Sequence, residues 1–272
     1  MSAVVAGVQL SSDARSDTGR RRPANEDSFL AVPPVFVVAD GMGGHEAGAQ
    51  ASADVVDALR ETLCTAGPVD LARVSTAIDE ASRRVTALAA TTQRGAGSTL
   101  SGVILVVHEG RPHWLIVNVG DSRVYRLIGG YLEQLTVDHS LVQERIDAGQ
   151  LRASDRASAP DKNVITRALG SADARADSWL MPVTTGERLL VCSDGLHGEL
   201  SDDQLREILV MSGRPPATTS ALIQAANRAG GRDNVTAVVV DVLSGGDPGI
   251  GPTPADTREP TGWTDEGDTV PV

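Results

Sequence analysis

The 272-residue chain has few cysteines, few aromatic residues and a single lysine. Its two cysteines, Cys64 and Cys192, are too few for a disulfide framework, and neither lies in a zinc-binding spacing, so a reducing compartment is expected. No run of 18 apolar residues is present, and the N-terminus has no basic stretch followed by an apolar one. We therefore predict a protein of the cytoplasm that has no membrane span.

Positive charge is also scarce. The formal net charge is −12, and Lys162 is the only lysine beside a set of arginines, a bias typical of a bacterium with GC-rich DNA. Such a balance argues against a nucleic-acid surface. It also implies that acids gathered at one place repel one another until cations bind.

Hydrophobic periodicity predicts an antiparallel α+β fold. Strand patterns cover residues 4–10 and 35–40, and helical patterns cover 46–64 and 69–91, with a Gly-Pro turn between the two helices that predicts a helical hairpin. Four strand-like runs at 99–108, 112–119, 123–127 and 131–135 predict a β-meander. A helix at 139–149 precedes a polar surface flap at 150–177.

The C-terminal part of the sequence predicts the last elements of the domain. A strand at 188–192, helices at 202–211 and 217–229, and a strand at 235–243 complete a catalytic domain predicted over residues 1–243. Residues 244–272 are rich in Gly, Pro, Thr and Asp and predict a disordered tail. Trp263 and the stretch Thr253–Asp256 indicate either a partner-docking or phosphorylation segment or an inert tail, and the inert interpretation is favoured.

Acidic residues mark five places where an apolar, strand-like run begins or ends. They are Glu26 with Asp27, Asp40, Asp121, Asp194 and Asp233. A single Asp-Gly after a strand is ordinary turn chemistry. Together, carboxylates at the ends of rigid strands, several with glycines beside them, are typical of an all-oxygen site for Mg²⁺ or Mn²⁺. Neither Cys nor His lies beside the acids to favour zinc.

Eight short motifs surround these acids in a fixed order. They are GRRRPANED (19–27), VADGMGGH (38–45), GST (97–99), NVGDSR (118–123), LTVDHS (135–140), ITRALG (165–170), CSDGL (192–196) and GGRDNVT (230–236). Each motif is weak alone, but the ordered set is specific. The chain resembles the metal-dependent protein serine/threonine phosphatases of type 2C. The resemblance implies a four-layer sandwich, in which two antiparallel sheets pack face to face and helix pairs cover the outer faces.

The resemblance also implies two Mn²⁺ or Mg²⁺ ions per chain and assigns their ligands. Asp40 would bridge the ions, Glu26 and the main-chain carbonyl of Gly41 would complete one, Asp194 and Asp233 would complete the other, and Asp27 would act through bound water. Two such ions about 3.5–4 Å apart lower the pKa of a bridging water, so that hydroxide exists near neutral pH. That hydroxide is the expected nucleophile.

Two further roles follow from the same resemblance. Asp121 would hold a third, more weakly bound ion. An ordinary role as the turn residue of Gly-Asp-Ser explains an aspartate at this position equally well. Arg22 lies four residues before Glu26, and its planar guanidinium would bind two oxygens of the phosphate.

The identity of the general acid is left open by a departure from the family pattern. Eukaryotic relatives often carry histidine directly after the Asp-Gly of the second motif, where this chain has Met42. His45 is the candidate acid in its place, and a water bound to a metal ion is its rival.

The expected function is hydrolysis of phosphoserine and phosphothreonine esters in proteins, opposing a bacterial Ser/Thr kinase, by a monomer that binds phosphoproteins. A binding module without turnover is the rival from another class, and it predicts loss of metal-binding acids, yet all are present. A phosphomonoesterase acting on small molecules is a second enzymatic alternative. Hydrolysis of p-nitrophenyl phosphate and of a phosphothreonine peptide, with and without Mn²⁺, discriminates among the three.

Overall fold

The computed structural model describes residues 1–43, 46–65 and 67–248, and two antiparallel β-sheets form its centre. The first sheet has the order β1 (Ser2–Val5), β2 (Val8–Asp17), β12 (Val235–Ser244), β11 (Arg188–Cys192), β8 (Arg123–Ile128) and β9 (Tyr131–Gln134). The second has the order β10 (Asp177–Pro182), β7 (Arg111–Val119), β6 (Leu100–His108), β4 (Val35–Met42) and β3 (Asp27–Val32), and the short β5 (Gly97–Ser98) also pairs with β4.

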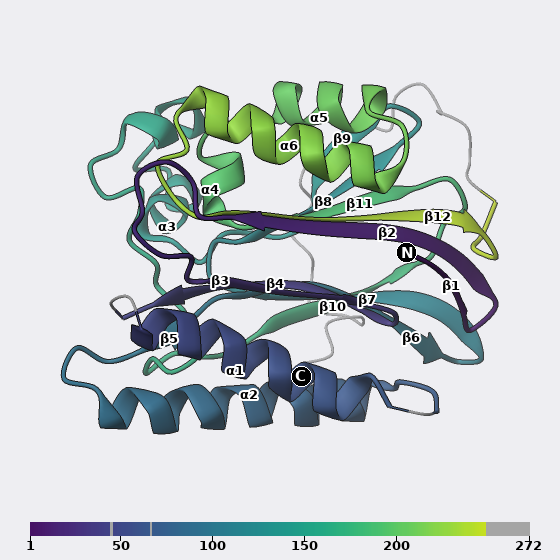
Figure 1. Cartoon of the computed structure of the whole chain (residues 1–272), viewed down its shortest axis with the longest axis horizontal. Helices are drawn as coiled ribbons and strands as arrows, with labels where there is room; N and C mark the ends of the chain where they lie inside the picture. Colours follow the sequence, from purple (N-terminus) through teal and green to yellow (C-terminus); the bar gives the residue numbers. More distant parts are fainter. Residues whose placement is uncertain (44–45, 66, 249–272) are drawn as a thin grey trace.

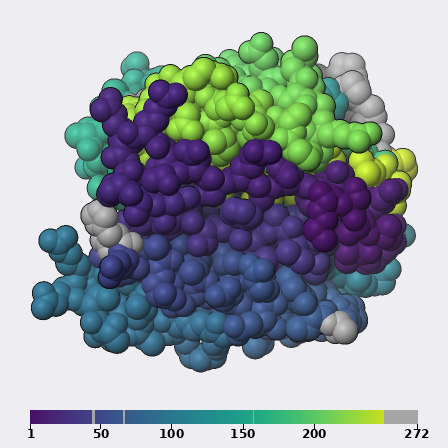
Figure 2. Space-filling model, in the orientation of Figure 1, coloured from purple at the N-terminus to yellow at the C-terminus, as the bar shows by residue number. Residues whose placement is uncertain are grey.

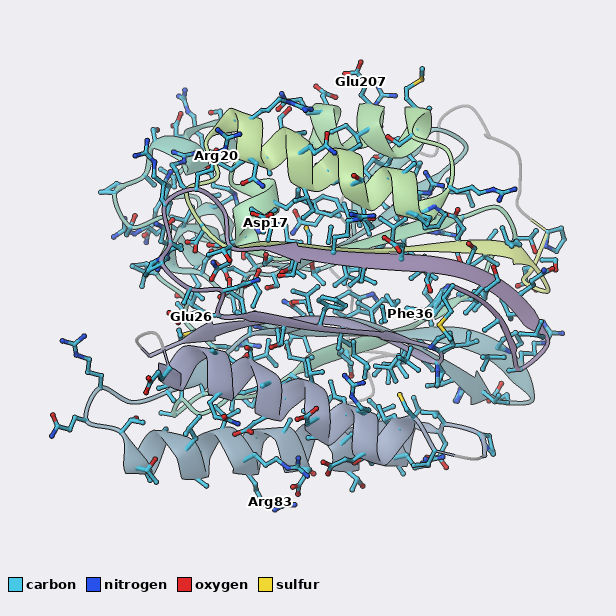
Figure 3. The ribbon with its side chains drawn as sticks, viewed as in Figure 1. Asp17, Arg20, Glu26, Phe36, Arg83 and Glu207 are labelled. Carbon is cyan, nitrogen blue, oxygen red and sulfur yellow. The ribbon has the colours of Figure 1, made fainter. Side chains whose placement is uncertain are left out.

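The sheets pack face to face, and β4 shows how the sequence produces this arrangement. Alternate residues of a strand point to opposite faces. Phe36 and Val38 therefore join the apolar cluster between the sheets, which also contains Trp114, whereas Val37 and Ala39 join the cluster beneath a helix pair. Figure 3 labels Phe36 in the layer between the two sheets. A strand buried on both faces explains the continuous apolar run at 35–39.

Helix pairs cover both outer faces, as expected. Helices α1 (Glu46–Leu63) and α2 (Leu71–Thr91) lie against the second sheet, and α5 (Asp202–Met211) and α6 (Pro215–Ala229) lie against the first (Figure 1). Figure 2 shows these two helical layers in blue and green on opposite sides of the molecule. Asp70 caps α2, and a capping box of Ser201 and Gln204 begins α5. The predicted four-layer sandwich is confirmed.

The predicted four-stranded meander is wrong in one respect, because its strands belong to two sheets. Strands β6 and β7 pair in the second sheet, whereas β8 and β9 pair in the first. The chain crosses between the sheets at residues 120–122, where Gly120 has a φ of +103°. Alternation within each strand says nothing about which sheet receives it, so the sequence pattern could not show this crossing.

Smaller differences concern short elements. The run at 4–10 is a hairpin rather than one strand, because Ala6 and Gly7 adopt positive φ between β1 and β2. A four-residue helix α4 (Asp194–His197) follows β11 directly. The region 139–177 contains α3 (Leu141–Asp147), the 3₁₀-helix η1 (Ala153–Ser158) and otherwise irregular chain up to β10.

The C-terminal end of the described chain continues beyond residue 243. Asp247 forms a parallel bridge with Thr184, and the Thr185 N–H donates to the Asp247 carbonyl at 2.9 Å. Residues 249–272, which make up most of the predicted tail and include Trp263, lie outside the described residues. Within the described part of the chain, no helix is long and apolar enough to cross a bilayer.

Candidate metal centre

The predicted acids gather at one end of the sandwich, where strands of both sheets finish or begin. Glu26, labelled in Figure 3, lies at this end. A pocket of about 400 Å³ opens there. Its lining consists of Arg22, Glu26, Asp40, Gly41, Met42, Gly43, Asn163, Ile165, Asp194, Asp233 and Asn234. Six residues that the sequence predicted as ligands or phosphate contacts are thus brought together, whereas His45 lies outside the described residues.

Two hydrogen bonds with Thr99, the residue between β5 and β6, fix the backbone of Asp40. Its N–H donates to Thr99 Oγ1, and its carbonyl accepts from the Thr99 N–H, both at 2.9 Å. Asp27, the first residue of β3, lies directly opposite Asp40 in the β3–β4 ladder. Two carboxylates from adjacent strands therefore start from the same register position.

Glycines bring the chain close around Glu26. The Gly41 N–H donates to the Glu26 carbonyl at 3.1 Å, and a Cβ added to Gly41 would lie 2.0 Å from the Gly48 carbonyl oxygen. A Cβ on Gly48 would lie 2.1 Å from Glu26 Oε2. Larger residues at either position would displace the Glu26 side chain or the strand beside it.

Asn234 positions the loop that carries Glu26, a role that sequence reasoning did not assign. Its Oδ1 accepts from the Glu26 N–H at 2.8 Å, and its Nδ2 donates to the carbonyls of Thr18 and Ala24 at 2.9 Å each. Asn234 itself is buried, and its three hydrogen bonds are partly shielded from water. The sequence feature that could have pointed to Asn234 is its position directly after Asp233 in GGRDNVT. Only the fold shows which backbone groups its side chain reaches.

Arg22 reaches the pocket from the same loop. Its Nη2 donates to Asp233 Oδ2 at 2.7 Å, and this hydrogen bond is the main cause that raises the pKa of Arg22. The guanidinium is half exposed, with 51% of its side-chain surface accessible. It therefore lies at the rim, where an incoming anion would meet it.

The carboxylates beneath the rim are partly or fully removed from water and have too little positive charge beside them to offset this. Burial and the neighbouring acids raise the pKa of Asp40 well above its ordinary range. Burial likewise raises the pKa of Asp27 to about 7 and that of Asp194 to about 6. Arg22 lowers the pKa of Asp194 but is too weak an influence to offset burial and the negative charge of Asp233.

Asp121 belongs to the same acidic group, although it does not line the pocket. It lies at the crossing between the sheets, and burial, followed by the charge of Asp194, raises its pKa well above the ordinary range. His197 Nε2 donates to the Asp121 carbonyl at 3.0 Å, and burial lowers the pKa of His197 to about 3, so this histidine stays neutral.

Buried oxygens at this site suit a hard cation. Among the described residues, Asp27 Oδ1, Asp121 Oδ1 and Asp194 Oδ1 are buried and accept no hydrogen bond. The other oxygen of Asp27 accepts from Ser193 Oγ at 2.8 Å and from Thr236 Oγ1 at 2.6 Å. Buried carboxylate oxygens without donors are costly unless a cation binds them. The donor set, all oxygen, matches Mg²⁺ or Mn²⁺ rather than zinc.

Among the described residues, no group of three or more His, Cys, Asp or Glu side chains lies close enough together to hold a metal ion as the side chains now stand. The acids converge on one pocket, with Asp233 engaged by Arg22.

Comparison with known sequences identifies phosphatases as relatives of this chain. The family model described as protein phosphatase 2C matches residues 23–230. Serine/threonine phosphatase stp of Listeria monocytogenes is 36% identical over 246 residues, covering 85% of this chain and 96% of the relative. Serine/threonine protein phosphatase PstP of Mycobacterium tuberculosis is 36% identical over 235 residues, covering 85% of this chain and 44% of the relative.

Solved structures resemble the fold over most of its length. The crystal structure of M. tuberculosis PstP/Ppp has a TM-score of 0.80 at 34% identity and covers 87% of this chain and 100% of that one. The catalytic domain of PstP in complex with two manganese ions has a TM-score of 0.79 at 34% identity and covers 87% and 99% of the two chains.

Proposed function

This chain belongs to the protein phosphatase 2C family of metal-dependent protein serine/threonine phosphatases, and we propose that it hydrolyses phosphoserine and phosphothreonine esters in proteins with two Mn²⁺ or Mg²⁺ ions. The observation that carries the proposal is a group of carboxylates beneath an arginine-rimmed pocket, three of which, Asp27, Asp121 and Asp194, each bury an oxygen that accepts no hydrogen bond from the described residues. When bound, such ions lower the pKa of water and offset the charge of the phosphate.

The ligand assignment is part of the proposal. Asp40, Glu26 and the Gly41 carbonyl would hold one ion, and Asp40, Asp194 and Asp233 would hold the other. Their common pocket supports this assignment, and the two manganese ions in the PstP domain support the number and kind of ion. Asp27 acts through water, which is supported by its position opposite Asp40 and by its one oxygen without a donor.

Arg22 binds the phosphate at the rim. Its guanidinium holds two coplanar oxygens of an anion in a forked geometry that lysine does not provide. In the structure this group is bonded to Asp233, so it exchanges at least part of that contact when phosphate enters.

A third, more weakly bound ion at Asp121 is supported by the burial of this carboxylate and its unpartnered oxygen among the described residues. Asp121→Asn tests it, because turnover should fall strongly while the two other ions remain bound. Wild-type turnover of this variant at low Mn²⁺ would make Asp121 a turn residue. His45 remains the proposed general acid, with a bound water as its alternative.

The decisive experiment measures hydrolysis of p-nitrophenyl phosphate and of a phosphothreonine peptide, each with Mn²⁺ and with EDTA. We expect both to be hydrolysed only with metal, and full activity in chelator would refute the metal mechanism. Hydrolysis of the small ester alone would indicate a small-molecule phosphomonoesterase, and hydrolysis of neither would indicate a binding module. We further propose that the chain acts as a monomer in the cytoplasm against the products of a bacterial Ser/Thr kinase.

A further inference from the structure

A second, smaller pocket adjoins the candidate metal centre. It has a volume of about 180 Å³. Its lining consists of Lys162, Asn163, Asp194, Gly195, Gly198, Glu199, Arg232 and Asp233. Asn163, Asp194 and Asp233 line both pockets, so the two are neighbours that share a wall. The smaller pocket therefore lies beside any phosphate that occupies the larger one.

The far wall of the smaller pocket carries positive charge. Arg232 forms a forked ion pair with Glu199, with Nε–Oε1 at 2.9 Å and Nη2–Oε2 at 3.1 Å. The Glu199 side chain is only 4% exposed, whereas that of Arg232 is 65% exposed. Lys162 lies near enough to contribute to lowering the pKa of Glu199, after the larger effect of Arg232. On this far wall two cations thus accompany one carboxylate, whereas the other two acids of the lining, Asp194 and Asp233, lie on the wall shared with the candidate metal centre.

Hydrogen-bond donors on this wall are available to a ligand. None of the described residues accepts a hydrogen bond from Lys162 Nζ or from Arg232 Nη1. Lys162 is also the only lysine in a chain with a net charge of −12. A flexible ammonium group on an exposed residue can follow a carboxylate or a phosphate over several ångströms.

The segment that carries Lys162 is held in place. Arg145 of α3 forms an ion pair of 2.5 Å with Asp161, the preceding residue. The Leu141 N–H donates to the Val164 carbonyl at 2.9 Å, which attaches the segment to the start of α3 on its other side. Lys162 therefore stands at a defined place beside the pocket, although its side chain is exposed.

We propose that this smaller pocket is a substrate subsite that accepts an acidic side chain close to the phosphorylated residue, with Lys162 as the specificity-determining residue. The proposal rests on the phosphatase function given above. An extended peptide advances about 3.3 Å per residue, so the acidic residue belongs within about three positions of the phosphothreonine. Arg232 contributes through its free edge while Glu199 fixes its orientation.

The test uses the full chain with Mn²⁺ and pairs of phosphothreonine peptides. Within a pair, one position near the phosphothreonine carries Glu or Gln, and the position is moved through the three residues on each side. The measured quantity is the ratio of kcat/KM for the Glu peptide to kcat/KM for the Gln peptide. We expect a ratio of about two to five at one position, the size typical of an exposed ion pair, and a smaller ratio at high salt.

Variants at position 162 identify the residue responsible. Lys162→Gln should bring the ratio close to one, Lys162→Arg should restore it, and Lys162→Glu should invert it. Arg206→Gln removes the same charge from an exposed position on α5 and should leave the ratio unchanged. A wild-type ratio of one at every position, or a ratio that Lys162→Gln leaves intact, would overturn the subsite while the phosphatase function stands. Failure of the wild type to hydrolyse any of the peptides or p-nitrophenyl phosphate would refute the proposed function itself.

Discussion

Two groups of buried carboxylates in this molecule differ in their partners. Asp138 accepts hydrogen bonds from Arg123 Nε at 2.8 Å and Nη2 at 2.7 Å, and from Arg156 Nη1 at 2.8 Å. Burial alone would raise the pKa of Asp138, but these arginines lower it on balance. Asp40 is half-buried among other acids, and desolvation followed by the charges of those acids raises its pKa well above the ordinary range.

The comparison separates an acid whose charge is compensated within the fold from one whose charge is not. A buried carboxylate with forked arginine partners links structural elements, and here Arg156 joins the 3₁₀-helix η1 to the β9–α3 connection. A buried carboxylate without such partners lowers stability until a cation arrives. Four predictions follow from this difference, and a fifth concerns a region distant from both groups.

The largest expected effect is on turnover. Asp40→Asn removes the proposed bridging ligand, so hydrolysis of p-nitrophenyl phosphate should fall to background, because both the metal and the activated water are lost. Asp203→Asn, at an exposed position of α5, is the matched control and should retain wild-type kcat. Unchanged kcat in Asp40→Asn with full metal content would contradict the ligand assignment.

The same substitution should change stability in opposite directions in the two groups. Asp138→Asn leaves two arginines without their buried partner and should lower the free energy of unfolding by about 3–5 kcal/mol. Asp40→Asn removes a buried charge among like charges and should raise the free energy of unfolding of the metal-free protein. Urea denaturation in EDTA measures both changes, and an equal loss in the two variants would remove the distinction between the groups.

The pH dependence of stability should reveal the uncompensated group. An acid whose pKa is higher in the folded chain binds its proton more tightly when folded, so stability falls as pH rises. The window extends from the ordinary Asp value of about 3.9 to the raised values of about 6 for Asp194 and about 7 for Asp27. Asp138, with a lowered pKa, contributes stability that is lost only below this window. The melting temperature in EDTA should therefore fall as the pH rises from about 5 to about 7.5, and saturating Mn²⁺ should reduce this fall.

A moderate effect is expected at the rim. Arg22→Ala should raise KM by about three- to tenfold with a smaller change in kcat, because a phosphate contact made equally in the ground and transition states contributes uniform binding. Steady-state kinetics with p-nitrophenyl phosphate measure both parameters. A fall in kcat alone would show that the guanidinium acts chiefly in the transition state, and no change in either would exclude it as the phosphate contact.

The smallest effect is expected at the chain end. Removal of residues 249–272 should leave the melting temperature nearly unaltered, whereas removal of 244–272 also deletes the bridge between Asp247 and Thr184 and should lower it by about 2–4 °C. Differential scanning calorimetry distinguishes the two truncations. Equal melting temperatures would place the domain boundary at residue 243, as the composition alone predicts.

The sequence by itself determined both helix pairs, most strands and the identity of the acids. Periodicity located both helix pairs, and the ordered motifs located the six pocket-lining residues predicted as ligands or phosphate contacts. These features are local, because side-chain period and turn chemistry depend on residues close together in the chain. The metal ligands themselves remain a prediction until the variants above are measured.

Only the tertiary structure decided which strands share a sheet and which acids lack partners. The pattern at 99–135 reads as one meander, yet Gly120 directs the chain from one sheet to the other. Asp138 and Asp121 look alike in sequence, each an acid in a turn, but only Asp138 meets Arg123 and Arg156. Burial and charge pairing depend on segments distant in the chain that the fold brings into contact, so no local pattern contains them.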